Sequence, residues 1–126
     1  MPTVLVVDDE FAIADLLETI LTDKGYRVLT ACNGKQGLAK MADIMPDLIL
    51  LDFMMPILDG AGMLRAMAAA PPYRHIPVIM ISSLNERVIA QKCAGYVAFL
   101  RKTFRVATVL STVANVLGDR KNNAAR

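Results

Sequence analysis

The sequence predicts an α/β protein in which helices cover both faces of a parallel sheet. Two observations support this prediction. Five short apolar runs of strand length alternate with five segments whose apolar residues recur at helical spacing. The 126 residues are 55% hydrophobic, above the roughly 45–50% of ordinary soluble domains, as expected when strands are buried on both sides. The length fits one domain.

The first strand and helix are expected within the first 25 residues. Residues 4–7 form a continuous run of valine and leucine, which is typical of a strand buried on both faces. From Ile13 onwards the apolar residues recur at the three- and four-residue spacing of an amphipathic helix. Gly25 is expected to end that helix as its C-cap glycine. Residues 27–31 are then predicted to form the second strand.

The next two helices flank the third strand. Asn33, with Gln36 three residues later, is expected to cap the second helix. Residues 48–51 are a second fully apolar run and are predicted to form the third strand. An alanine-rich helix is expected to follow over residues 60–70, where a pair of prolines ends it.

The last two strands and helices complete the alternation. Residues 78–81 are predicted to form the fourth strand, and residues 96–100 the fifth. Ser83 and Glu86 have the spacing of a capping box, so the fourth helix is expected to begin there and to break near the next glycine. The final helix shows a regular apolar stripe and is expected to stop at Gly118.

Five such β-α units favour the flavodoxin-like (βα)5 doubly wound parallel sheet with strand order 2-1-3-4-5. In such sheets, ligands bind at the carboxyl ends of the strands, near the switch point between the first and third strands. We expect this domain to span residues 1–118 and to be followed by a short polar, basic tail over residues 119–126.

Bulk properties exclude several classes of protein. No apolar run approaches the roughly 18 residues that span a bilayer, and the first residues lack the basic leader of a secretory signal. We therefore expect a soluble, cytoplasmic protein with no membrane partner. Cys32 and Cys93 show no metal-ligand spacing and are expected to be free thiols.

The charges are divided unevenly along the chain. Residues 1–59 carry ten acidic and four basic residues, whereas residues 60–126 carry two acidic and ten basic ones. Half of those ten acids belong to or border the expected site. The excess basic residues of the second half lie in two places, the tail and a candidate face for docking a protein partner. Direct binding of the tail to nucleic acid is not expected. The basic residues assigned to that face are Arg87, Lys92, Arg101 and Arg105.

Reactive side chains follow four of the five predicted strands. The first strand ends in Asp8 and Asp9, the third in Asp52 and the fourth in Ser82, and Lys102 follows the fifth. Taken singly, each would be an ordinary cap, turn or loop residue. Together they supply a nucleophile, ligands for a hard cation such as Mg²⁺, a cationic clamp and a hydroxyl donor. This combination predicts phosphoryl transfer to a carboxylate.

With these residues in place, the sequence resembles the receiver domain of two-component response regulators, of the single-domain, CheY-like class. The resemblance extends over roughly residues 3–118. The segments that carry it are residues 4–10 (VLVVDDE), 47–56 (DLILLDFMMP), Asp59-Gly60, 77–83 (PVIMISS) and Lys102.

The resemblance implies an aspartyl-phosphate switch in a phosphorelay. Asp52 would take the phosphoryl group from a histidine kinase or a histidine phosphotransfer protein. Asp9 would bind Mg²⁺ directly and Asp8 through water, while Asp52 and the carbonyl of Met54 complete the ligands. Such a receiver catalyses at most its own phosphorylation and dephosphorylation, and we expect no turnover of a separate substrate.

The resemblance also implies roles for three further residues. Lys102 would pair with the phosphoryl oxygens, Ser82 would hydrogen-bond the phosphoryl group, and Phe99 would swing inward as the coupled aromatic residue. The downstream protein target would bind through the fourth helix, fifth strand and fifth helix.

One departure from the family pattern and the residues at two further positions affect what is expected of the site. Thr103 replaces the usual proline, and because a cis bond before a non-proline residue costs about 2.5–4 kcal/mol, we expect Lys102-Thr103 to be trans. Met54 and Leu84 stand where the family tunes loss of the phosphoryl group, and since neither can hydrogen-bond water, we expect slow autodephosphorylation. Thr103 also keeps open an alternative, a receiver-like interaction module that signals without phosphorylation.

Overall fold

Five parallel strands form one sheet in the order β2-β1-β3-β4-β5, as the sequence predicts. The computed structural model of the chain describes residues 1–125, with side chains through residue 118. The register pairs Val7 with both Ala31 and Leu51. Strands β1 and β3 therefore end side by side in the middle of the sheet, which is the switch point of the topology. The strands are β1 (Thr3–Val7), β2 (Arg27–Ala31), β3 (Leu48–Asp52), β4 (Val78–Ser82) and β5 (Ala98–Arg101).

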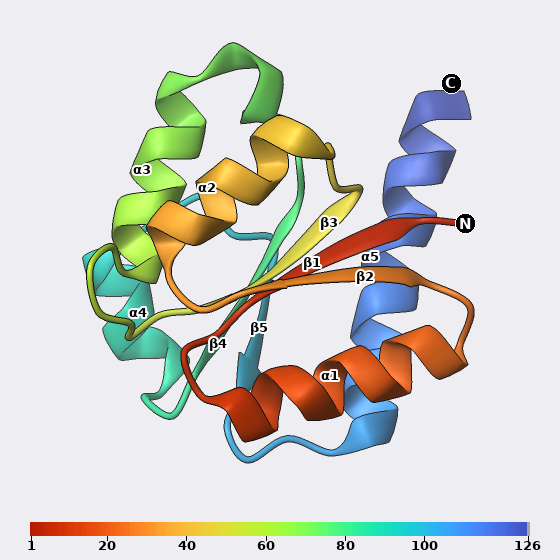
Figure 1. Cartoon of the computed structure of the whole chain (residues 1–126), viewed down its shortest axis with the longest axis horizontal. Coiled ribbons are helices and arrows are strands. Elements are labelled where there is room, and N and C mark those ends of the chain that lie inside the picture. The colour runs from red at the N-terminus through yellow and green to blue at the C-terminus, as the bar shows by residue number, and fades with distance from the viewer. Residues whose placement is uncertain (126) are drawn as a thin grey trace.

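The helices divide between the two faces of the sheet. In Figure 1, α1 and α5 cover one face, and α2, α3 and α4 lie over the other. Among the described residues, no helix is both long and apolar enough to cross a membrane. The helices are α1 (Phe11–Asp23), α2 (Gly34–Asp43), α3 (Gly60–Ala69), α4 (Glu86–Lys92) and α5 (Val106–Ala125), with one 3₁₀ turn, η1 (Pro71–Tyr73), before β4.

The alternation of side chains along each strand gives the molecule two cores. Leu5 and Val7 point into the core under α2, α3 and α4, whereas Val4 and Val6 point into the core under α1 and α5. Every residue of β1, β3 and β4 is buried. This burial on both faces accounts for the continuous apolar runs from which the strands are predicted.

Two helix ends agree with the predicted caps. The Asn33 side chain accepts a hydrogen bond from the backbone N–H of Gln36 at 2.8 Å, which satisfies one free donor at the start of α2. Helix α1 is followed by Gly25 at φ +93°, a left-handed conformation that glycine adopts without steric cost.

At two other helix ends, the structure differs from the prediction. The cap of α4 is Asn85, which accepts from the N–H of Val88 at 3.0 Å. The Ser83–Glu86 capping box is therefore wrong: Glu86 is the first helical residue, where its charge is favourable at the positive helix end. Helix α5 continues past Gly118 to Ala125, because a helix-interior glycine costs only about 1 kcal/mol relative to alanine.

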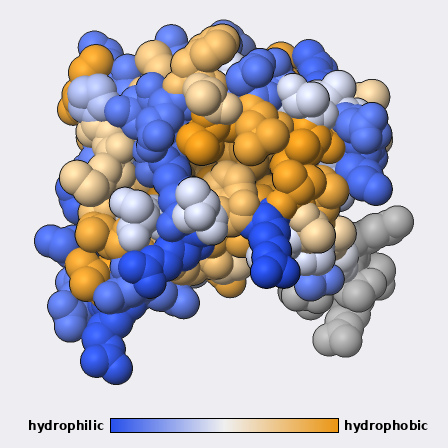
Figure 2. All heavy atoms as spheres, turned by 90° about the horizontal axis from the view of Figure 1, so that it is seen from below, coloured by the Kyte–Doolittle hydropathy of each residue, from blue (hydrophilic) through white to orange (hydrophobic). Residues whose placement is uncertain are grey.

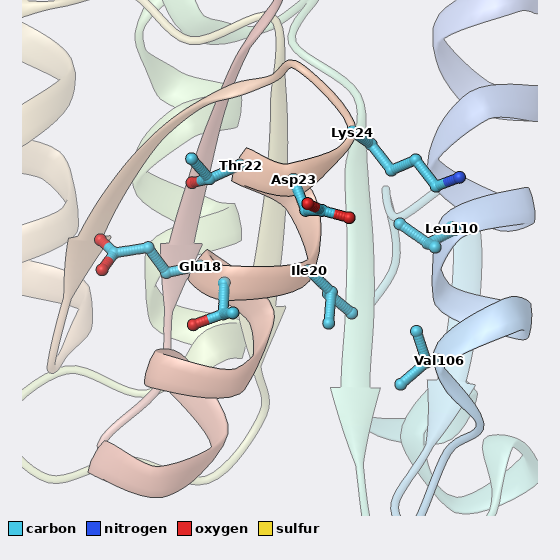
Figure 3. A pocket seen from close by; sticks show the side chains of 8 residues that line it. Glu18, Ile20, Thr22, Asp23, Lys24, Val106 and Leu110 are labelled. Atoms are coloured by element: carbon cyan, nitrogen blue, oxygen red, sulfur yellow. The ribbon is translucent and has the colours of Figure 1, made fainter.

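The helices α1 and α5 leave an open groove between them. A surface groove of about 730 Å³ lies between them, and Figure 3 shows Ile20, Val106 and Leu110 in the space between the two helices. Seen from below in Figure 2, apolar residues gather across the middle of the molecule. The exposed large apolar residues of these helices include Phe11, Leu16 and Val106.

Candidate functional site

The carboxyl edge of the sheet brings four predicted residues together. Asp52 and Ser82 are the last residues of β3 and β4, and Asp8 and Lys102 follow β1 and β5 directly. Asp8, Asp52 and Ser82 are 2%, 4% and 2% exposed, so three polar side chains are buried at this edge. Buried polar groups of this kind require a partner or a ligand.

The Lys102 ammonium lies among three carboxylates. Its Nζ is 2.6 Å from Glu10 Oε1, 3.2 Å from Asp8 Oδ2 and 3.5 Å from Asp52 Oδ1. The backbone N–H of Lys102 also donates to the Ser82 carbonyl oxygen at 2.9 Å, which fixes the loop after β5 to the end of β4. One positive charge thus faces three negative ones.

The carboxylates fit a divalent cation. Asp8 Oδ1 accepts a hydrogen bond from the Glu10 N–H at 2.8 Å. Asp8 Oδ2 is buried, and no described group donates a geometrically acceptable hydrogen bond to it. Oxygens of Asp8, Glu10 and Asp52 lie within 4.8 Å of one another. Carboxylate oxygens at such spacing are the ligands that Mg²⁺ prefers, and an added cation would bind the Asp8 oxygen that lacks a hydrogen bond.

The environment of Asp52 favours its protonated form. Burial raises the pKa of Asp52, the negative charge of Asp8 raises it further, and hydrogen bonding to Asp9 and Asp8 adds to the rise. The positive charge of Lys102 acts in the opposite direction, and the pKa settles at about 7. Asp52 would therefore be fully ionised at neutral pH only with more positive charge beside it than Lys102 supplies.

The Lys102 ammonium is held in its charged form. Burial lowers the pKa of Lys102, but the hydrogen bond that its ammonium donates to Glu10 and the charges of Asp52 and Asp8 more than offset this, so that the pKa rises above its ordinary value. Lys102 is therefore a permanent cation at the carboxyl edge across the neutral range.

A family model described as the response regulator receiver domain matches residues 4–114. The chain belongs to this family. The receiver is 48% identical over 84 residues to response regulator PleD of Caulobacter vibrioides, covering 67% of this chain and 18% of PleD. It is 35% identical over 132 residues to the DNA-binding dual master transcriptional regulator RpaA of Synechocystis, covering 100% of this chain and 54% of RpaA. It thus spans about half or less of these relatives.

Solved structures agree with the family and with the fold. The Vibrio cholerae chemotaxis protein CheY4 superimposes on the receiver with a TM-score of 0.87 at 31% identity, covering 92% of this chain and 98% of that one. The predicted fold class and the membership of two-component signalling are therefore confirmed.

The remaining predicted residues of the receiver lie around the acidic cluster. Asp9 is exposed and lines a groove with Met54 and Leu84 beside the site. The Ser82 hydroxyl accepts a hydrogen bond from the Leu84 N–H at 3.1 Å. Phe99 is half-buried in β5, packs against the core under α2, α3 and α4, and lies 6.5 Å from the Tyr96 ring.

One prediction at the site is wrong. The Lys102-Thr103 peptide bond is cis, not trans. The expectation of trans rested on the preference of an isolated amide, which says nothing of tertiary contacts. In the receiver, Lys102 is held at its backbone by Ser82 and at its ammonium by Asp8.

Sequence reasoning assigned no role to Glu10. It follows the Asp8-Asp9 pair and is one of the acids that border the predicted site. The structure brings its side chain to the Lys102 ammonium, 92 residues away in the chain. The available signal was its place in the loop between β1 and α1, which opens on the carboxyl edge.

The loop after Asp52 is packed tightly against two helices. The Gly34 N–H donates to the Leu58 carbonyl oxygen at 2.9 Å, and the Gly60 N–H donates to the Phe53 carbonyl oxygen at 2.9 Å. A Cβ on Gly34 would lie 2.7 Å from the Leu58 carbonyl oxygen, and a Cβ on Gly62 would lie 2.5 Å from the Leu58 side chain. Glycine is needed at residue 34 because the Leu58 backbone approaches so closely, whereas at residue 62 the near atom is the end of the Leu58 side chain.

Proposed function

We propose that this receiver accepts a phosphoryl group on Asp52 from a histidine kinase or a histidine phosphotransfer protein in a Mg²⁺-dependent reaction. The observation that carries the proposal is the buried Asp52 carboxylate at the end of β3, with the Lys102 ammonium 3.5 Å away and Asp8 beside it. We assign this function to residues 1–118 and none to the tail, residues 119–126.

The transfer exchanges one bond to phosphorus for another. A carboxylate oxygen of Asp52 attacks the phosphorus of the donor's phosphohistidine, and a P–O bond forms as the P–N bond breaks. The bonding electron pair leaves with the imidazole nitrogen, so no oxidant or further reactant is needed. Lys102 offers its N–H groups to the phosphoryl oxygens, and Ser82 offers its hydroxyl.

The acidic residues would hold the cation in this reaction. Asp8, Asp9 and Asp52, with the Met54 carbonyl, are the proposed ligands. Bound Mg²⁺ supplies positive charge that keeps the Asp52 carboxylate ionised and offsets the charge of the phosphoryl oxygens. The raised pKa of Asp52 in the metal-free protein supports this requirement.

The switched surface in this proposal is formed by α4, β5 and α5. Ser82 is the last residue of β4 at the site, and Phe99 lies in β5, which forms part of that surface. The basic side chains there are exposed, so a downstream protein with an acidic surface fits it best. The exposed basic residues are Arg87, Lys92, Arg101 and Arg105.

The test is phosphorylation by acetyl phosphate with Mg²⁺, read by intact-protein mass spectrometry. We expect wild type to gain one phosphoryl group and Asp52→Asn to gain none. Asp43→Asn removes one carboxylate from the exposed end of α2 and serves as the matched control. If wild type and the control also remain unlabelled, and none binds beryllium fluoride, the interaction module that needs no phosphorylation replaces this proposal.

A further inference from the structure

The shortest contact of the Lys102 ammonium is with a residue outside the proposed phosphorylation set. Glu10 Oε1 lies 2.6 Å from Lys102 Nζ, closer than either Asp8 at 3.2 Å or Asp52 at 3.5 Å. An ammonium group has three N–H donors. Among the described residues, the ammonium donates a hydrogen bond to Glu10, whereas Asp8 and Asp52 contact it as longer ion pairs. A phosphoryl group on Asp52 that draws the ammonium toward itself therefore competes with Glu10 for its position.

Glu10 is the partner that can leave at least cost. Its side chain is 58% exposed, whereas those of Asp8 and Asp52 are 0% and 6% exposed. When the ion pair opens, water hydrates the Glu10 carboxylate, but Asp8 would be left buried without its cation.

On this basis, and resting on the function proposed above, we propose that Glu10 is a positioning residue that holds the Lys102 ammonium in the resting receiver. The phosphoryl group on Asp52 takes Lys102 from Glu10, so Glu10 acts as a competitor that weakens retention of the phosphoryl group.

Two other roles for Glu10 predict different behaviour. Glu10 is the N-cap residue of α1, but its side chain makes no capping hydrogen bond, so its substitution removes no cap contact. Its carboxylate also lies within 4.8 Å of the ligating oxygens of Asp8 and Asp52. If it were a metal ligand, its loss would weaken Mg²⁺ binding rather than tighten binding of a phosphoryl group.

The experiment measures binding of beryllium fluoride, a phosphoryl mimic, by calorimetry at saturating Mg²⁺. Because a partly exposed ion pair is worth up to about 1 kcal/mol, Glu10→Gln is expected to bind it about two- to fivefold more tightly than wild type. Glu10→Asp keeps the charge but shortens the side chain by one methylene. Its affinity for beryllium fluoride should move toward that of Glu10→Gln if the contact with Lys102 matters. It should match that of wild type if only the charge matters. Asp15→Asn, on the exposed face of α1, controls for the loss of one negative charge.

Separate titrations with Mg²⁺ alone, followed by amide NMR shifts, complete the test. We expect the Mg²⁺ affinity of Glu10→Gln to stay within twofold of wild type. Unchanged or weaker beryllium fluoride binding, an equal gain in Asp15→Asn, or a large loss of Mg²⁺ affinity would each overturn the role of Glu10. Failure of wild type itself to bind beryllium fluoride or accept a phosphoryl group would instead refute the proposed function.

Discussion

The α-carbon of Gly60 faces the carbonyl oxygen of Asp52 so closely that a Cβ at residue 60 would lie 2.6 Å from that oxygen. The same Cβ would lie 2.9 Å from the α-carbon of Phe53. Both neighbours are backbone atoms, which cannot rotate away as the end of a side chain can. The start of α3 and the end of β3 are thus fitted together with no room for a methyl group.

We therefore predict that Gly60→Ala destabilises the protein by about 2 kcal/mol or more, because backbone must shift to admit the methyl group. Urea unfolding measures the change. Gly118→Ala is the matched control: among the described atoms outside the neighbouring α5 backbone, none lies within 4 Å of a Cβ placed there. Alanine within α5 should stabilise the helix by up to about 1 kcal/mol. If Gly60→Ala and wild type had equal free energies of unfolding, the close packing of residue 60 against the Asp52 backbone would be refuted.

Asp52 should make the metal-free protein less stable as pH rises. Its folded-state pKa is about 7, against an ordinary value of 3.8, so between these pH values the folded protein holds a proton that the unfolded chain has released. Stability therefore falls through this window, and the cost is complete above pH 7.

It follows that Asp52→Asn, measured by urea unfolding in EDTA, should be more stable than wild type by on the order of 1–3 kcal/mol at pH 8. The difference should nearly vanish near pH 4. A difference that is constant across this range would show that Asp52 does not titrate in this window.

Lys102 should stabilise the metal-free receiver and compete with Mg²⁺. In EDTA at pH 8, Lys102→Ala is expected to lose about 1–3 kcal/mol, because Asp8 and Asp52 stay buried without their cation. Mg²⁺ should then stabilise the variant more than wild type, since no ammonium occupies the carboxylates. The exposed Lys35→Ala should change stability by less than about 0.5 kcal/mol. The idea fails if Mg²⁺ stabilises Lys102→Ala and wild type equally.

The phosphoryl group on Asp52 should be lost slowly. Met54 and Leu84 line the groove at the site, and neither side chain can orient an attacking water by hydrogen bonding. After removal of the phosphodonor in Mg²⁺, we expect the labelled protein to persist well beyond seconds. Met54→Asn adds an amide and should shorten the lifetime, whereas Met45→Asn, at a similarly exposed methionine, should not. Loss within seconds in wild type would contradict this prediction.

The sequence was sufficient for the sheet and for most of the site because both depend on local patterns. Buried parallel strands require continuous apolar runs, and parallel strands all end at one edge, which brings Asp8, Asp52, Ser82 and Lys102 together. These inferences need no knowledge of side-chain conformation.

The features that were missed depend on tertiary contacts or on competing local ones. The pairing of Glu10 with Lys102 joins two loops whose rotamers no sequence pattern reports. The cis bond before Thr103 opposes the preference of the isolated amide. At α4, both Ser83 and Asn85 can cap a helix, and only the folded loop decides in favour of Asn85.

Leu58 also determines how far the loop between β3 and α3 can vary in evolution or by design. Its carbonyl binds Gly34 at the start of α2, while its side chain fills the space over Gly62 in α3. An inserted residue between Met54 and Asp59 would have to displace α2 and α3 together. Insertions and reporter tags should therefore be rejected in this loop, although surface loops elsewhere commonly tolerate them.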